Sequence, residues 1–147
     1  MKILIDADGC PVVDITVRLC IKYRIQCLLL CDTAHEFHRE GAVTLIFDKG
    51  SDSVDYALAN KVEPGDIVIT QDYGLASMCL SRGARALHQD GWEYTSDNIG
   101  ALLWQRHESR KHWASGGRVK GPRKRDAQQD RNFAAALEEI LQTVVQG

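Results

Sequence analysis

The stretch MKILIDADGC, residues 1–10, joins a short apolar run to two carboxylates that are one residue apart. Residues 2–5 are rich in β-branched side chains and predict a strand. If the chain stays extended beyond them, Asp6 and Asp8 point to the same side, about 6.6 Å apart. Two anions in one small volume repel each other, so a cation, a proton or water should offset their charge.

The rest of the chain alternates predicted strands and helices. Apolar runs predict further strands at residues 25–31, 43–47, 67–70 and 84–87. Helical spacing and capping residues predict helices that begin at Pro11, behind Ser51 or Asp52, at Leu75, behind Thr95 or Ser96, and at Asp126. Strands separated by helices favour a three-layer α/β fold in one domain, with a mainly parallel sheet and helices on both faces.

Acidic residues follow the predicted strands. Asp6 and Asp8 come after the first strand, and Asp72 follows the strand at residues 67–70 by two positions. Asp52 and Asp55 are three residues apart and share one face near the start of the intervening helix. Ligands of such sheets bind beyond the carboxyl ends of the strands. We therefore expect Asp6, Asp55 and Asp72 to share one site, with Asp8 and Asp52 at its margin.

A cluster of carboxylates suits Mg²⁺ or Mn²⁺, which prefer oxygen ligands and take few protein carboxylates alongside substrate phosphate. Such a cation activates water and neutralises charge on a phosphodiester. Asp6, Asp55 and Asp72 are the expected catalytic metal ligands, and Asp8 and Asp52 are expected to act through water or on a second metal. Without metal, the carboxylates should raise one another's pKa values. The Thr70 hydroxyl, if it points the same way, would orient a carboxylate or water.

The net charge of −2 hides a strong asymmetry. Residues 106–125 carry eight Lys or Arg and one Glu, whereas the remainder carries ten basic and nineteen acidic residues. A solvated linker between two helices explains a few of these charges, and so many in one stretch also suit a polyanion. The expected nucleic-acid contacts are Arg110, Lys111, Arg118, Lys120, Arg123, Lys124 and Arg125, with RNA preferred.

Several other classes are disfavoured. The five cysteines form no CxxC pair, which favours reduced thiols in the cytoplasm that pack as small apolar groups. No apolar run approaches the length of a membrane span or of a signal peptide. His35 and His38 are one residue short of the zinc-protease spacing and are expected in a loop. No glycine-rich phosphate-binding loop is present.

Five stretches carry a resemblance: KILIDADGCPV, FDKGSDSVDYAL, EPGDIVITQDYGLASMCLSRGA, YTSDNIGALL and, near the end, RDAQQDRNFAAALEEIL. In this order they resemble the YaiI/YqxD family of uncharacterised bacterial proteins. That family is similar to PIN-domain-like nucleases, whose site is a metal-binding group of acids. The resemblance implies a PIN-like fold, with Asp6, Asp55 and Asp72 as the matching acids. Asp8 and Asp52 match acids of the family itself.

Two other functions stay open beside a nuclease. A PIN-like protein that binds RNA without cutting it would use the basic segment for phosphates and Trp104, Trp113 or Tyr73 for stacking on bases. ILIDADGC also resembles the first motif of haloacid-dehalogenase-type phosphatases, in which Asp6 would be the nucleophile and Asp8 the general acid or base. Against that class, Cys10 stands where Thr or Val is usual. A homodimer is a further open expectation.

Overall fold

The computed structural model describes residues 1–34, 38–48, 53–102, 104 and 124–146. Its sheet has the strand order β3-β2-β1-β4-β5-β6. The first five strands run parallel, and the last runs antiparallel to β5. The strands are β1 (Lys2–Asp6), β2 (Gln26–Asp32), β3 (Val43–Phe47), β4 (Ile67–Ile69), β5 (Arg85–Leu87) and β6 (Glu93–Tyr94). The predicted mainly parallel sheet is confirmed, whereas β6 was not predicted.

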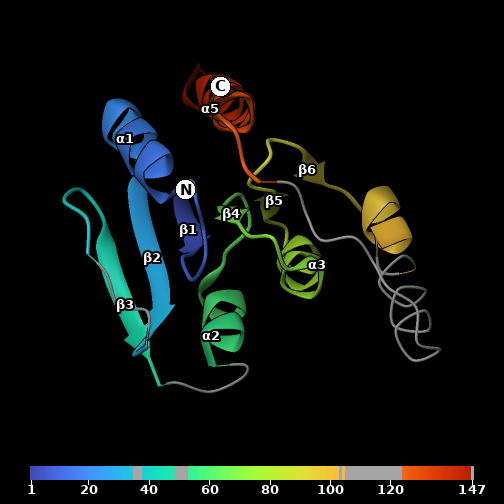
Figure 1. The fold of residues 1–147 in the computed structure, drawn as a ribbon. Helices are drawn as coiled ribbons and strands as arrows, with labels where there is room; N and C mark the ends of the chain where they lie inside the picture. Colours follow the sequence, from blue (N-terminus) through green and yellow to red (C-terminus); the bar gives the residue numbers. More distant parts are fainter. Residues whose placement is uncertain (35–37, 49–52, 103, 105–123, 147) are drawn as a thin grey trace.

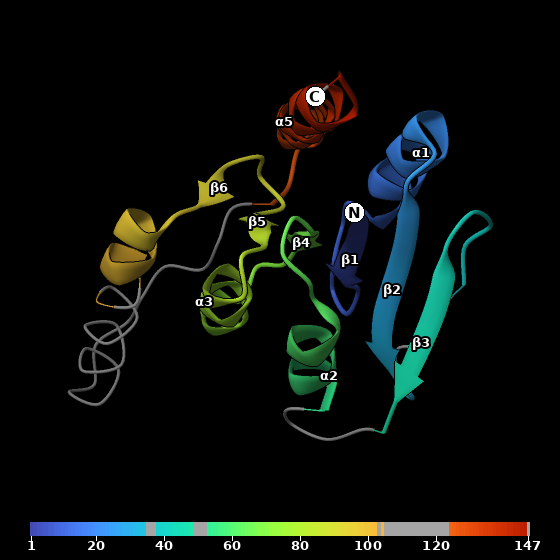
Figure 2. The ribbon, with the colours of Figure 1, turned by 180° about the vertical axis from the view of Figure 1, so that it is seen from behind.

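Helices cover both faces of this sheet (Figures 1 and 2). The labelled helices are α1 (Val13–Tyr23), α2 (Ser53–Lys61), α3 (Tyr73–Ser81) and α5 (Ala127–Gln146), and residues 96–102 are also helical. α1 and α5 lie on one face, and α2 and α3 lie on the other. The predicted three-layer α/β fold is therefore confirmed.

Strand alternation separates the two cores. Ile3 and Ile5 of β1 belong to the cluster that α1 and α5 complete, in which Phe133 and Leu137 of α5 are fully buried. Leu4, between them, belongs to the cluster formed with α2 and α3. Because successive side chains of a strand point to opposite faces, a central strand that is apolar at every position is buried on both.

The chain turns immediately after β1, which corrects two expectations. The backbone N–H of Cys10 donates to the carbonyl of Ala7 at 3.1 Å, and Gly9 has φ of +67°. Asp8 therefore lies in a tight turn rather than on an extended strand beside Asp6. Pro11 belongs to the turn that follows, and α1 begins two residues later, at Val13.

Two helices begin with reciprocal caps: the predicted cap Thr95, and Asp126, which was predicted to begin the last helix and instead caps α5. The side chain of Asp126 accepts a hydrogen bond from Gln129 N at 3.0 Å, and the Gln129 side chain accepts one from Asp126 N at 2.8 Å. Thr95 and Asn98 form the same reciprocal pair at the start of the helix at residues 96–102. Each pair satisfies two backbone donors that a helix start leaves unpaired.

Four of the five free cysteines, at positions 20, 27, 31 and 79, are buried, as expected for thiols that pack as small apolar groups. Within the described ranges, no helix is both long enough and apolar enough to cross a membrane.

The strand order reverses direction at the centre of the sheet. From β1 the chain moves outward to β2 and β3, and it then returns to place β4 on the other side of β1. In open α/β sheets the crevice beyond the carboxyl ends of such a strand pair is where ligands bind. The ends of β1 and β4 are therefore the first place to look for a site.

Candidate metal centre

Asp6 and Thr70 are neighbours because of the strand register. Ile5 of β1 is paired with Ile69 of β4, so Asp6 and Thr70 follow side by side. Each is two positions after a residue that faces α2 and α3, Leu4 or Val68, so both point to that face of the sheet. The Thr70 hydroxyl donates to Asp6 Oδ2 at 3.0 Å. The Thr70 hydroxyl therefore points towards the carboxylate of Asp6, which is the condition for the orienting role considered from the sequence.

Asp72 connects this pair to the start of α3. Its backbone N–H donates to Thr70 Oγ1 at 3.0 Å. Its carboxylate caps the helix, since Asp72 Oδ1 accepts hydrogen bonds from Gly74 N at 2.8 Å and Leu75 N at 3.2 Å. The helix consequently begins two residues earlier than the predicted Leu75. An Asp two positions after a strand and before a helix is itself the sequence signal for this cap.

The pKa of Asp6 is raised from its ordinary value to about 6. Burial is the largest cause, because it disfavours the charged form, and the hydrogen bond from Thr70 opposes it. The carboxylates of Asp55, Asp72 and Asp8 each raise the pKa further. The structure thus brings these three acids within electrostatic range of Asp6. The expectation that neighbouring carboxylates raise a pKa is confirmed for Asp6, although burial contributes more.

The described carboxylates do not converge on one point. Among residues 1–34, 38–48, 53–102, 104 and 124–146, no group of three or more His, Cys, Asp or Glu side chains is placed to hold a metal ion. Asp52, the remaining predicted ligand, lies outside the described residues. The acids near Asp6 therefore form an electronegative surrounding for it rather than a closed set of ligands.

A narrow recess, too tight to admit a water molecule, lies at this edge of the sheet. It is lined by Asp6, Asp8, Cys10, Ile69, Thr70, Gln71 and Gln89. Burial raises the pKa of the Cys10 thiol to about 11, so the thiol is protonated at neutral pH and is a poor nucleophile. Gln71 and Gln89 were not predicted, because a single glutamine in a loop carries no pattern.

An aromatic cluster flanks the acidic edge. The rings of His88 and Trp92 are stacked with centroids 4.4 Å apart, and Trp92 meets Tyr94 edge to face at 4.6 Å. Tyr94 Oη donates to the carbonyl of Thr70 at 3.1 Å, which joins the cluster to the residue that holds Asp6. The ring of Tyr73, a predicted stacking residue, meets the ring of Tyr94 edge to face, with centroids 6.2 Å apart. His88 and Trp92 were missed because the prediction considered aromatic residues only beside basic ones and at Tyr73.

The family model described as "Uncharacterized BCR, YaiI/YqxD family" matches residues 4–143. The chain belongs to this family. UPF0178 proteins of Exiguobacterium sibiricum and Clostridium acetobutylicum are 50% and 44% identical to it, over 96% of this chain and 96% and 97% of their own lengths. A UPF0178 protein of Lachnoclostridium phytofermentans is 40% identical over 98% of this chain and 99% of its own. No solved structure matches.

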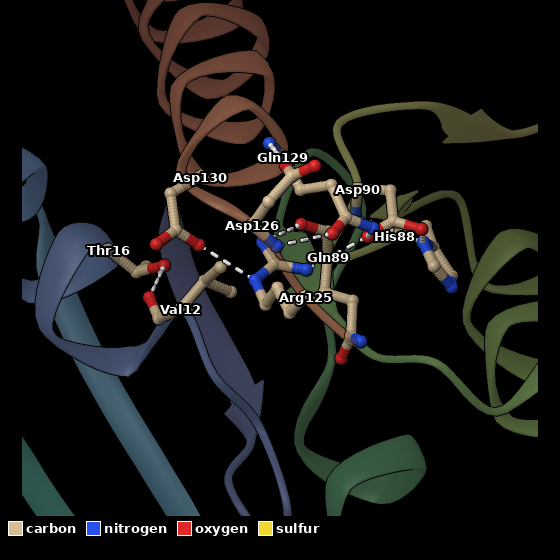
Figure 3. Close-up of polar contacts among 9 residues, drawn as sticks. All are labelled: Val12, Thr16, His88, Gln89, Asp90, Arg125, Asp126, Gln129 and Asp130. Atoms are coloured by element: carbon tan, nitrogen blue, oxygen red, sulfur yellow. Dashed lines mark hydrogen bonds and ion pairs between the residues drawn. The ribbon is translucent and has the colours of Figure 1, made fainter. Parts of the chain in front are cut away.

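In this YaiI/YqxD member Arg125, at the end of the basic segment, makes internal contacts (Figure 3). Arg125 Nε donates to Asp130 Oδ1 at 2.7 Å, Nη1 to Asp90 Oδ1 at 2.9 Å and Nη2 to the carbonyl of Gln89 at 2.8 Å. We call this set of contacts the Arg125 clasp. Because all three guanidinium nitrogens are engaged, we withdraw Arg125 from the predicted nucleic-acid contacts.

Lys124, beside Arg125, is exposed. The other predicted nucleic-acid contacts lie outside the described residues: Arg110, Lys111, Arg118, Lys120 and Arg123. The stacking candidate Trp113 and the loop residue His35 also lie outside them, whereas His38 and Trp104 are exposed.

Proposed function

We propose that this protein is a Mg²⁺- or Mn²⁺-dependent nuclease that hydrolyses phosphodiester bonds, with RNA preferred over DNA. One observation carries the proposal: the carboxylate of Asp6, oriented by the Thr70 hydroxyl at 3.0 Å, lies close to three further acids at the end of β1. Burial and these acids together raise its pKa to about 6. The carboxylate lies at the point of the sheet where α/β proteins bind ligands. Perturbed carboxylates in such a crevice mark functional sites, because isolated burial of charge is costly.

The donor set fits a hard divalent cation. Mg²⁺ keeps several waters and binds through one or two carboxylates plus substrate phosphate, so it does not require three converging acids. Asp6 is the proposed direct ligand, because Thr70 fixes its orientation. Asp55, Asp72 and Asp8 would add charge and hold metal-bound waters, and Asp72 would do so with its Oδ2, since Oδ1 caps α3. The cation would activate water and neutralise charge on the phosphodiester.

The chain's own charges favour a long anionic substrate. The basic segment at residues 106–125 carries eight Lys or Arg. Seven remain for phosphate contacts when Arg125 is set aside. Such residues bind the sugar-phosphate backbone and position a strand without reading its sequence.

Cleavage of labelled single-stranded RNA and DNA, with Mn²⁺, Mg²⁺ or EDTA, tests this proposal. We expect metal-dependent cleavage in the wild type and loss of at least 100-fold in kcat/KM in Asp6→Asn, because the direct ligand is removed. Glu139→Gln, an exposed carboxylate of α5, is the matched control and should leave the rate unchanged. Metal-independent cleavage, or full activity in Asp6→Asn, would refute the proposal.

The absence of three converging ligands among the described residues also favours a second candidate, an RNA-binding protein that does not cut. In that case RNA should bind with salt-dependent affinity in EDTA, while no product forms with either metal. The phosphatase alternative gives a third result in the same assay, since it would hydrolyse p-nitrophenyl phosphate and leave phosphodiesters intact.

A further inference from the structure

The turn at residues 88–92 connects β5 to β6 and is held in place from both ends. His88 N donates to the carbonyl of Trp92 at 2.9 Å, and Asp90 N donates to His88 Nδ1 at 3.0 Å. The Arg125 clasp ties the same turn to the start of α5 through Gln89 and Asp90 (Figure 3). Side-chain exposure of Arg125 is 19%, so these ion pairs are partly shielded from solvent and hold a fixed geometry.

In this arrangement Arg125 contacts only the backbone of Gln89, and the Gln89 side chain takes no part in the clasp. Arg125 contacts the Gln89 carbonyl, whereas the Gln89 side chain lines the recess next to Asp6 and Asp8. Figure 3 shows that side chain extending away from α5. Within the described residues, no hydrogen bond occupies the Gln89 amide. Gln89 is partly exposed, so its amide is suited to contact a ligand that lies on the surface over this narrow recess.

The hydrogen-bonding capacity of an amide indicates which group of a nucleotide it would contact. Phosphate oxygens accept hydrogen bonds only and would be drawn to the cation at Asp6. A primary amide both donates and accepts, and so does a hydroxyl group. The ribose 2′-hydroxyl is adjacent to the scissile phosphate in RNA and is absent from DNA. An amide that lies beside the metal site, and is not itself a metal ligand, is therefore suited to exchange hydrogen bonds with that hydroxyl.

The remainder of the turn suits the base of the same nucleotide. The stacked rings of His88 and Trp92 lie on either side of Gln89 in the sequence, and both are partly exposed. Aromatic faces stack on bases of any identity, and this contributes affinity without sequence preference. One short turn thus places an amide and the partly exposed ring of Trp92 near the proposed metal site, although one face of that ring is covered by His88.

We propose that Gln89, held by the Arg125 clasp, contacts the ribose 2′-hydroxyl and makes this site select RNA over DNA. Gln89 is the specificity residue and Arg125 is its positioning residue. This inference rests on the proposed nuclease function and names the substrate class of that site.

The test compares kcat/KM for an RNA oligonucleotide and for the DNA oligonucleotide of the same sequence, with Mn²⁺. In Gln89→Ala the value for RNA should fall about 3- to 10-fold, as expected for one lost hydrogen bond, while the value for DNA stays unchanged. Gln142→Ala, an exposed glutamine of α5, is the matched control. Folding is not at risk in Gln89→Ala, because Arg125 contacts the backbone carbonyl.

Arg125→Gln should reproduce the loss of RNA preference, whereas Arg131→Gln, an exposed arginine of α5, should not. Thermal melting and Mn²⁺ titration of each variant separate misfolding or metal loss from lost selectivity. An unchanged RNA-to-DNA ratio in Gln89→Ala, or an equal fall on both substrates, would overturn the role of Gln89 and leave the nuclease proposal standing. A wild type that cleaves neither substrate would overturn both.

Discussion

The hydroxyl of Thr70 donates a hydrogen bond of 3.0 Å to one oxygen of Asp6, across two neighbouring parallel strands. The bond stabilises the ionised carboxylate and so acts against burial, which has already raised the pKa of Asp6 to about 6. The same hydroxyl accepts from the backbone of Asp72. One short side chain thereby sets both the direction and the charge of the central acid.

Removing the Asp6 charge should stabilise the metal-free protein at neutral pH. The folded pKa of about 6 lies above the ordinary value of 3.8, so the folded state binds more protons between these values. The contribution of Asp6 to the free energy of unfolding is then fully present below about pH 4, and it is lost as the pH rises through about 6. We expect Asp6→Asn to be about 1 to 3 kcal/mol more stable than wild type at pH 7.5 and equal to it below pH 4.

Urea unfolding in EDTA across this pH range measures the effect. Glu139→Gln, whose carboxylate is exposed, should follow the wild-type pH profile. An Asp6→Asn protein that is less stable than wild type at pH 7.5 would instead indicate that the carboxylate is structurally required.

Thr70→Val should raise the pKa of Asp6 further above 6, because the only hydrogen bond known to lower it is lost. The variant also leaves the N–H of Asp72 without its acceptor, which should cost about 1 to 2 kcal/mol. An NMR titration of the Asp6 carboxyl carbon reads the pKa directly. Thr70→Ser keeps the hydroxyl and should retain the wild-type value; an equal rise in Thr70→Ser would show that the hydroxyl does not set the pKa of Asp6.

Asp72 has a structural role that can be separated from any metal role. Asp72→Ala removes the cap of α3 and should destabilise the protein by about 1 kcal/mol, while Asp72→Asn keeps a capping oxygen and should not. If Asp72 also contributes charge to a metal site, Asp72→Asn should bind Mn²⁺ more weakly at unchanged metal-free stability. Equal Mn²⁺ affinity in Asp72→Asn and wild type would confine Asp72 to the helix cap.

Mn²⁺ should stabilise the wild type, because a ligand that binds only the folded state adds to its stability. At 100 times the dissociation constant the gain is about 2.7 kcal/mol. The cation should also lower the pKa of Asp6, since it favours the ionised form. Differential scanning fluorimetry of wild type, Asp6→Asn and Asp55→Asn checks this, with both variants expected to lose most of the gain. Equal stabilisation of all three proteins would place the bound metal elsewhere.

The basic segment is tested by the salt dependence of RNA binding. Each phosphate contact on a single strand contributes about −0.7 to the slope of log affinity against log salt. Alanine at both Arg123 and Lys124 should therefore make the slope shallower by about 1.4. The charge-matched control replaces Arg18 and Arg131, which are exposed on α1 and α5. An unchanged slope in the Arg123 and Lys124 variant would remove these two residues from the interface.

The parts of the fold that sequence predicts are those governed by local patterns. Apolar runs located β1 to β5, and the oxygen side chains of Thr95 and Asp126 marked two helix starts. The two-residue strand β6 was missed, because a pair of residues shows no periodicity. Asp8 was placed on an extended chain, although Gly9 permits the turn that the structure contains.

Contacts between residues far apart in the sequence account for the remaining differences between the predicted and the observed site. Arg125 stands in a run of basic residues and was predicted to bind nucleic acid. Its partner Asp90 is 35 positions away, and no local pattern connects the two. Gln89 was missed for the same reason, since only the clasp and the end of β1 bring it to the recess.

The position of α5 has a consequence for biosynthesis. Phe133 and Leu137 are fully buried against the face of the sheet that contains Ile3 and Ile5. A ribosome adding about 5 to 20 residues per second needs roughly 6 to 25 s to make the residues between Ile5 and Phe133. Throughout that interval the N-terminal strand lacks the α5 side chains that complete its burial. The nascent chain therefore offers an apolar surface to chaperones until its last helix emerges.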